Sequence, residues 1–334
     1  MANSLIVLPD DSAKAILEAI EGASRTLRVK MFVFSDPGLL KAVSAAKRRG
    51  VKVRVMLNPA RRNGDHDNDT TRKALERADI EVRDANPAFA LTHEKSMVVD
   101  DETAYVQSFN WTTKNLTETR DYAMVTTGRH DVAEIIECFE ADWHRHTFEP
   151  SHVSHLVWCP GHGRDRICRL IDATSHKLVV QNERLHDMVI IEHLIRARRR
   201  GVKVDIMVRP PHTFKREKLV EGVGGLRIMD DVGIKIHKLK HLKLHGKMLL
   251  ADGVAAIVGS INFAAGSLDG RRELAIETHD ESVVDRLHKV ARHDWDHSHA
   301  LDLSDEGLLA DLEDRIQGSA ELLAIDDQDE YAGN

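Results

Sequence analysis

A set of polar residues occurs twice in this chain at a constant spacing, and this repeat is the strongest constraint on its fold. His93 and His245 are 152 residues apart, and each is followed by a lysine two positions later and an aspartate seven positions later. The same spacing joins Lys95 to Lys247, Asp100 to Asp252, Ser108 to Ser260, Asn110 to Asn262, Asp121 to Glu273, and Asp142-Trp143 to Asp294-Trp295. Upstream, Arg48 to Val53 recurs as Arg199 to Val204 at a spacing of 151. The chain is therefore predicted to be an internal duplication with one polar set in each half.

The duplication predicts two similar halves rather than two unrelated domains. We expect these halves at residues 1–150 and 151–300, followed by an acidic helix and tail at 301–334. A chain of 334 residues, 42% hydrophobic and 30% charged, can bury one large core that both halves share. Strand and helix patterns alternate along each half, which predicts an α/β fold with a mostly parallel mixed sheet flanked by helices.

Capping and turn residues place the individual elements. In the first half, helix starts are expected at Asp10 to Ser12 and at Asp36-Pro37, and Gly50 is placed to end the second helix. The other elements expected there are strands at 27–34, 51–57 and 80–82, strands around His93 and Tyr105, helices at 73–78 and 132–139, and a polar surface loop at 61–69. The second half should contain a helix at 166–173, a strand at 178–181, a helix ending near Gly201 and a strand at 202–208. An irregular join is expected at 150–163, which is rich in Pro, Gly and His.

Each polar set contains the residue types that a site needs to bind and cleave a phosphate ester. On an extended strand, His245 and Lys247 project from the same face, which places an imidazole beside a cation. The Gly-Ser-x-Asn segment at 259–262 offers a hydroxyl and an amide that can hold anionic oxygens. Cleavage of a phosphodiester needs charge neutralisation, a nucleophile and a proton donor, and these residue types supply all three.

The pattern His-x-Lys-x4-Asp, followed by Gly-Ser-x-Asn and then an acidic residue, resembles the phospholipase D superfamily, whose members carry two such motifs in each active site. This resemblance covers both halves and implies two α/β halves related by a pseudo-two-fold axis, with one active site at their junction. It implies catalytic roles for His93, Lys95, Asp100, His245, Lys247 and Asp252. Phosphate-binding or orienting roles are implied for Ser108, Asn110, Asp121, Ser260, Asn262 and Glu273. No metal or other cofactor is needed in this chemistry.

The resemblance also implies a mechanism with two histidines. One histidine attacks phosphorus to form a covalent phosphohistidine, and the other protonates the leaving oxygen and then acts as base. Which of the two is the nucleophile stays open, with family analogy pointing to His93. Asp121 and Glu273 are expected to orient the imidazoles, each within its own half. Asp100 and Asp252 are expected to fix local turns by bonding to nearby backbone.

The chain departs from the family pattern at two positions of the first half. Gln107 stands where a glycine is usual, and its larger side chain is expected to narrow that side of the pocket. Asp121 stands where the second half has Glu273, and the shorter acid is expected to loosen its hydrogen bond to an imidazole.

The substrate is less constrained than the chemistry. A formal net charge of −7 and only 4% aromatic residues argue against a protein that coats nucleic acid. The single-chain duplication favours phospholipid phosphodiester chemistry of the phospholipase D or cardiolipin synthase type, by family analogy. A metal-independent nuclease of the same superfamily is the alternative. From a different class, a non-catalytic protein that keeps the phosphate pocket stays open.

Features outside the polar sets bear on location and assembly. The N-terminal apolar run is too short for a signal peptide, no stretch has membrane-spanning length, and three cysteines form no disulfide framework. A cytoplasmic protein is expected, with peripheral contact at the inner membrane face as an option and the apolar loop Pro87 to Leu91 as the contact nearest a motif. Because both motifs lie in one chain, a monomer is sufficient for one complete site.

Three further segments have competing interpretations. The basic run from Lys235 to Leu244 is either a lip that attracts anionic substrate or an edge strand whose lysines prevent aggregation. His293 and His297 are one helical turn apart, but they belong to no structural-zinc pattern, so no metal is expected there. Leu308, Leu309, Leu312 and Ile316 suit one amphipathic packing helix, and residues 326–334 are expected to be disordered.

Overall fold

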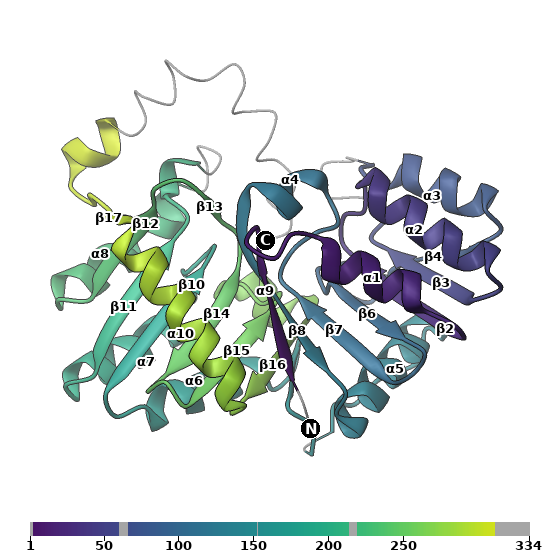
Figure 1. The fold of residues 1–334 in the computed structure, drawn as a ribbon. Coiled ribbons are helices and arrows are strands. Elements are labelled where there is room, and N and C mark those ends of the chain that lie inside the picture. The colour runs from purple at the N-terminus through teal and green to yellow at the C-terminus, as the bar shows by residue number, and fades with distance from the viewer. Residues whose placement is uncertain (1–2, 60–65, 152, 214–218, 311–334) are drawn as a thin grey trace.

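The computed structural model describes residues 3–59, 66–151, 153–213 and 219–310, and these form two mixed sheets that lie side by side (Figure 1). The strands of the first sheet, in spatial order, are β1 (Ser4–Leu8), β8 (Thr119–Thr126), β7 (Thr103–Gln107), β6 (Ser96–Val99), β2 (Thr26–Met31), β3 (Lys52–Leu57) and β4 (Glu81–Asp84). Those of the second are β17 (Ser298–Ala300), β12 (Lys235–Leu239), β11 (Lys203–Val208), β10 (Lys177–Asn182), β14 (Lys247–Ala251), β15 (Ala255–Gly259) and β16 (Arg271–Thr278), with β9 (Leu156–Cys159) also paired to β16.

Helices pack against both sheets. In the first half these are α1 (Lys14–Gly22), α2 (Pro37–Arg48), α3 (Asp69–Arg77), α4 (Thr113–Thr117) and α5 (Arg129–His144). In the second half they are α6 (Gly163–Ala173), α7 (Met188–Arg199), the 3-10 turn η1 (Pro211–Thr213), α8 (Leu219–Asp231), α9 (Ala265–Asp269) and α10 (Glu281–Asp296). Figure 1 shows α1, α2 and α3 at one end of the molecule and α7 and α8 at the other.

The apolar core has the same layered arrangement. One cluster joins α1 and α2 to the first sheet, and another joins α6, α7 and α8 to the second. A third cluster combines residues of α5, α10 and both sheets, so it connects the halves. Burial of each Leu, Ile or Val side chain contributes about 1.5–3 kcal/mol, and the central cluster therefore stabilises the contact between the halves.

The capping residues explain why the repeated helices begin and end where they do. The Asp36 carboxylate accepts a hydrogen bond from the Leu39 N–H at 2.9 Å, and Asp187 does the same for Ile190 at 3.0 Å. These carboxylates satisfy N–H groups that have no partner within the first turn. Past the ends of α2 and α7, Gly50 and Gly201 both adopt a φ of 94°, which a residue with a side chain rarely tolerates. The expected helix start at Asp36-Pro37 and the expected ends at both glycines are confirmed.

Two very short strands cross from one half to the other. β5 (Leu91–Thr92) comes from the first half and pairs with β16, whereas β13 (Lys243–Leu244) comes from the second half and pairs with β8. The two exchanges are equivalent under the duplication, as a pseudo-two-fold axis requires. The expected fold class, two α/β halves around such an axis, is confirmed.

The pairing within each sheet differs from the expectation in one respect. Parallel pairs connect β2, β3 and β4 in the first half and β10, β11 and β12 in the second. The strands that carry the polar sets, β6, β7 and β8 in the first half and β14, β15 and β16 in the second, pair antiparallel, so antiparallel pairs predominate. The short turns between β6 and β7 and between β14 and β15 cannot make the crossover that a parallel pair needs, and the expectation of a mostly parallel sheet did not allow for these hairpins.

Other segments also differ from the sequence predictions. The basic run is no edge strand, because β12 lies between β11 and β17, and β13 continues into the first sheet. The join at 150–163 contains β9, and α8 was not predicted. Residues 305–310 are helical, but the rest of the expected tail helix and the disorder expected at 326–334 lie outside the described residues, as does most of the expected loop at 61–69.

Candidate active site

The strand exchange places each histidine against the other half. The backbone N–H groups of His93 and Glu94 both donate to the Arg272 carbonyl at 2.9 Å, which fixes the end of β5 beside β16. In the equivalent position the Gly246 N–H donates to the Arg120 carbonyl at 2.7 Å, which fixes the end of β13 beside β8. Arg120 and Arg272 precede the two acidic residues of the polar sets, so each imidazole is brought to the acid of the opposite half.

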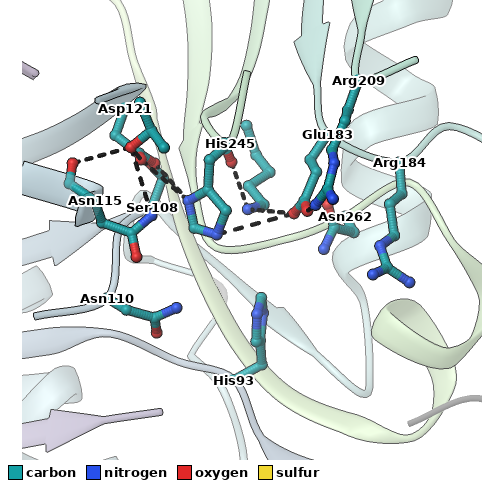
Figure 2. A network of polar contacts seen from close by, with 12 residues as sticks. His93, Ser108, Asn110, Asn115, Asp121, Glu183, Arg184, Arg209, His245 and Asn262 are labelled. Carbon is teal, nitrogen blue, oxygen red and sulfur yellow. Dashed lines mark hydrogen bonds and ion pairs between the residues drawn. The ribbon is translucent and has the colours of Figure 1, made fainter. Parts of the chain in front are cut away.

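The resulting imidazole–carboxylate pairs connect the halves. His93 Nδ1 lies 2.9 and 3.1 Å from the carboxylate oxygens of Glu273. His245 Nδ1 lies 2.9 and 3.1 Å from those of Asp121, and Figure 2 shows this second pair. The expected pairing within each half is therefore wrong, because β5 and β13 exchange the histidines. The expected looser bond at Asp121 is also wrong, since the two pairs have the same distances.

These contacts define which ring nitrogen is available for chemistry. Nδ1–H of each imidazole donates to a buried carboxylate, so Nε2 is the nitrogen left to meet a substrate. Figure 2 shows His93 and His245 approaching one space from opposite sides. Burial alone would raise the pKa of Glu273, but the charge and hydrogen bond of His93, with Lys95 and Arg271, hold that pKa below its usual value. The carboxylate stays ionised and keeps the imidazole oriented.

Hydroxyl groups fix the two carboxylates in turn. Ser108 and Thr119 each donate to Asp121 at 2.5 Å, and Ser267 donates to Glu273. Ser108 also accepts from the Tyr122 N–H at 2.8 Å, so its hydroxyl orients the acid. These contacts support the orienting role that was offered for Ser108 as an alternative to phosphate binding.

The remaining serine and the two asparagines have different surroundings. Ser260 Oγ accepts from the Leu274 N–H at 3.1 Å and donates to the Leu274 carbonyl at 3.2 Å, which uses the hydroxyl in strand pairing. Asn110 Oδ1 accepts from the Val33 N–H at 3.3 Å. Both amide atoms of Asn262 are buried without a hydrogen-bond partner among the described residues. Figure 2 places Asn110 and Asn262 on either side of the two imidazoles, where amides can hold anionic oxygens.

The lysines of the two sets have unequal environments. Lys95 is buried, and its ammonium lies 5.2 Å from the centre of the Phe32 ring. Lys247 is also buried, but its ammonium donates to Glu183 at 3.1 Å. Arg209 donates to the other oxygen of Glu183 at 3.1 Å. Glu183 and Arg209 were not recognised from the sequence, because neither belongs to the repeated set.

Asp100 and Asp252 fix turns at the far end of the motif strands. Asp100 accepts hydrogen bonds from the backbone N–H groups of Ser24, Arg25 and Thr26, and Asp252 accepts from those of residues 175–177. Both adopt a positive φ, 54° and 50°. β6 spans four residues, so Asp100 lies roughly 13 Å beyond the start of that strand and away from the imidazoles. The turn role expected for both aspartates is confirmed, and these contacts give neither of them a place beside the reacting atoms.

Replacement of Asp100 by asparagine should therefore lower stability without lowering turnover. Burial alone would raise the pKa of Asp100, but hydrogen bonds from Thr26, Arg25 and Ser24 together lower it to about 2, below the usual 3.8. Its stabilisation is thus present above pH 4 and lost as the pH falls toward 2. Because Asn tolerates the positive φ, the change removes the charge without straining the backbone. The free energy of unfolding should fall by about 1–2 kcal/mol at pH 7, and it should decrease less steeply than in the parent chain as the pH is lowered.

Chemical unfolding between pH 2 and 7 measures this prediction. Asp79→Asn is the matched control, because Asp79 has a φ of 59° and its side chain is 95% exposed. If the free energy of unfolding of Asp100→Asn decreased as steeply toward acid pH as that of the parent chain, the stabilising role of the Asp100 carboxylate would be contradicted.

Gln107 has a packing role. Its side-chain oxygen accepts a hydrogen bond from the Trp111 indole at 2.8 Å, so the amide is directed into the first-half core. At the equivalent Gly259, a Cβ atom would lie 2.3 Å from the Leu274 carbonyl oxygen, which leaves no room for a side chain. The two halves therefore differ in strand packing here.

A buried ion-pair network lies behind the His93 strand. Lys30 donates to Glu94 and to Asp142, both at 2.8 Å. Burial alone would lower the pKa of Lys30, but the negative charges of these carboxylates more than offset that effect and raise it. Glu94, Cys138 and Asp142 offer metal-ligand atoms within 4.8 Å of one another, but the Lys30 ammonium already bonds to both carboxylates. Arg272 of the second half also contacts Asp142 at 3.2 Å, and Arg120 pairs with Asp294 in the equivalent position. The repeated Asp-Trp pairs thus contribute the acids that connect the halves.

Comparison with protein families finds the same repeat. A family model described as cardiolipin synthase, PLD-like domain matches residues 16–143 and again residues 167–295. Cardiolipin synthase B of Salmonella typhi is 26% identical over 325 residues, which cover 83% of this chain and 76% of that protein. Mitochondrial cardiolipin hydrolase of Homo sapiens is 31% identical over 161 residues, which cover 45% of this chain and 60% of that protein. The match thus spans less than two thirds of the human relative's length.

Solved structures share the fold at low sequence identity. Phosphatidylserine synthase from Haemophilus influenzae Rd KW20 aligns with a TM-score of 0.72 and 14% identity, covering 96% of this chain and 94% of that one. Polyphosphate kinase from Porphyromonas gingivalis aligns with a TM-score of 0.69 and 16% identity, covering 95% of this chain and 53% of that one. Among the described helices, none is long and apolar enough to cross a membrane.

Proposed function

Since this chain belongs to the family of cardiolipin synthase, PLD-like domain proteins, we propose that it is a phosphodiesterase or phosphatidyltransferase that acts on a phospholipid. The observation that carries the proposal is the pair of imidazoles, each held through Nδ1 by a buried carboxylate of the other half. Residues 1–150 and 151–300 contribute one histidine each in this proposal, and residues 301–334 contribute none.

The reaction has two steps. In the first, His93 Nε2 attacks phosphorus, the bond to the leaving alkoxide breaks, and His245 Nε2–H protonates the leaving oxygen. In the second, a hydroxyl or water attacks the phosphohistidine, its proton passes to His245, and the bond from phosphorus to His93 breaks. Lys95 and Lys247 offset the charge on the non-bridging oxygens, and the asparagine amides donate hydrogen bonds to them.

The unequal surroundings of the histidines support this division of roles. The Phe32 ring meets His93 edge-on at 5.0 Å between ring centres, which shields the imidazole from water. His245 Nε2 lies 3.9 Å from a carboxylate oxygen of Glu183, a polar setting suited to a group that gives and takes a proton.

A phospholipid substrate is supported by the relative that resembles both halves. Cardiolipin synthase B aligns with 83% of this chain, whereas the cardiolipin hydrolases align with less than half. Pro87, Ala88 and Ala90 are exposed beside the His93 strand, and we infer that this loop contacts a membrane surface peripherally.

The test is turnover in EDTA on phosphatidylglycerol vesicles, phosphatidylcholine vesicles, and single- and double-stranded DNA. We expect release of the lipid head group or formation of a transfer product, and no DNA cleavage. Cleavage of DNA in EDTA would replace the lipid proposal by a nuclease with the same histidine chemistry. No turnover on any of these substrates would favour a binding protein that keeps the phosphate pocket.

A further inference from the structure

Besides the difference between Asp121 and Glu273, the duplication is broken at a second position next to the imidazoles. Phe32 is the first residue after β2, and Glu183, 151 residues later, is the first residue after β10. The strands correspond in register, since Lys30 pairs with Ser96 and Gln181 with Met248. An aromatic ring therefore stands beside His93 where a carboxylate stands beside His245.

The Glu183 carboxylate is held rigidly in the site. Its side chain has no exposed surface, one oxygen is 3.1 Å from the Lys247 ammonium, and the other is 3.1 Å from the Arg209 guanidinium. Arg209 is itself braced by Thr213 at 2.9 Å. Figure 2 shows Glu183 and Arg209 on the His245 side of the site.

The position of this carboxylate relative to His245 determines what can fit between them. The distance of 3.9 Å from His245 Nε2 is too long for a direct hydrogen bond. A small polar group can lie within hydrogen-bond distance of both atoms. When His245 acts as base, both atoms are acceptors, so the group between them needs two protons to satisfy them. A monohydric alcohol brings one such proton, whereas a 1,2-diol brings two.

A cationic head group fits this position poorly. Lys247 and Arg209 already bring two positive charges to the single carboxylate, so an ammonium or choline group would meet net repulsion. A neutral hydroxyl donor meets no such repulsion.

We propose that Glu183 determines acceptor specificity by selecting a 1,2-diol, the chemistry of a glycerol head group, over a monohydric alcohol. This inference rests on the proposed transfer function. The first hydroxyl of the diol attacks phosphorus and passes its proton to His245 Nε2 as the bond from phosphorus to His93 breaks. The second hydroxyl keeps its proton and donates a hydrogen bond to Glu183.

Competition between two acceptors that share a carbon skeleton tests the proposal. Phosphatidylcholine vesicles are incubated with the full chain and equal concentrations of 1,2-propanediol and 1-propanol, and the two phosphatidyl products are quantified by mass spectrometry. Both alcohols attack the same phosphohistidine, so the product ratio reports the second step alone. A variant that merely disturbs Lys247 would slow formation of the intermediate and leave the ratio unchanged.

The variants are Glu183→Met, which keeps the length but removes the acceptor, and Glu183→Gln, which keeps a weaker neutral acceptor. We expect the diol-to-alcohol ratio to fall at least about tenfold in Glu183→Met and less in Glu183→Gln. Glu134→Gln is the control, because Glu134 is also buried but bonds to the Trp158 indole. Its ratio should equal that of the parent chain.

The outcomes separate this inference from the function on which it rests. A parent chain that leaves the lipid uncleaved overturns the proposed function and the inference together. Cleavage with an unchanged ratio in Glu183→Met overturns the inference alone. Cleavage by the parent chain that yields only phosphatidic acid overturns it as well, because water would then be the two-proton acceptor.

Discussion

Replacement of His93 or His245 by alanine is expected to reduce lipid turnover by at least about 10⁴-fold while the fold is retained. Each imidazole makes one of two indispensable contributions, so the double variant should be scarcely worse than either single variant. Head-group release in EDTA measures activity, and thermal unfolding measures the fold. His130→Ala is the control, because His130 is exposed in the first turn of α5. Full activity in either site variant would contradict the two-histidine mechanism.

A phosphodiester with a p-nitrophenol leaving group distinguishes the two histidines. This leaving group needs no proton, so His245→Ala should still form the phosphohistidine but lack the base for the second step. A burst of one nitrophenolate per chain followed by slow release is expected for His245→Ala, and no burst for His93→Ala. The reverse pattern would make His245 the nucleophile.

The sequence was sufficient for the fold class and for most of the residues that lie together at the candidate site. A constant spacing of 152 residues between chemically matched residues cannot arise from packing alone, so it predicted two similar halves and their polar sets. Capping residues such as Asp36 and Asp187 act over three positions of the chain, and local interactions of this kind are readable in sequence.

Which acid meets which histidine could not be read from spacing. Asp121 lies 28 residues after His93, and Glu273 lies 28 residues after His245, so the repeat itself is identical whether the pairs form within or between the halves. The choice depends on β5 and β13, and strands of two residues have no hydrophobic pattern that sequence analysis could detect.

Glu183 illustrates a different limit. The repeat draws attention to positions that match, whereas this residue is informative because it does not match Phe32. Its proximity to His245 follows from the pairing of Asn182 with Lys247 between β10 and β14. An alignment of the two halves extended to unmatched positions beside each motif strand would have singled it out.

The buried ion pairs between the halves should be the most sensitive points for stability. Arg120 donates to both carboxylate oxygens of Asp294 at 2.9–3.2 Å, and both side chains are 3% exposed. Arg120→Met would leave Asp294 buried with the Gln181 amide at 2.9 Å as its remaining described hydrogen-bond donor. The free energy of unfolding should fall by about 3–5 kcal/mol, because leaving a buried charge without its partner destabilises a protein far more than breaking an ion pair at the surface.

The equivalent change in the other half supplies the comparison. Arg272→Met would leave Asp142 with the Lys30 ammonium at 2.8 Å. Burial would raise the pKa of Asp142, yet Lys30 and Arg272 lower it to about 2. Because one cation remains, Arg272→Met should cost clearly less than Arg120→Met in urea unfolding, and adding Asp294→Leu to Arg120→Met should recover part of the loss. Equal losses of unfolding free energy in the two single variants would contradict this electrostatic explanation. They would mean that the arginines stabilise the junction by packing, because a packing effect does not depend on whether the partner acid retains a second cation.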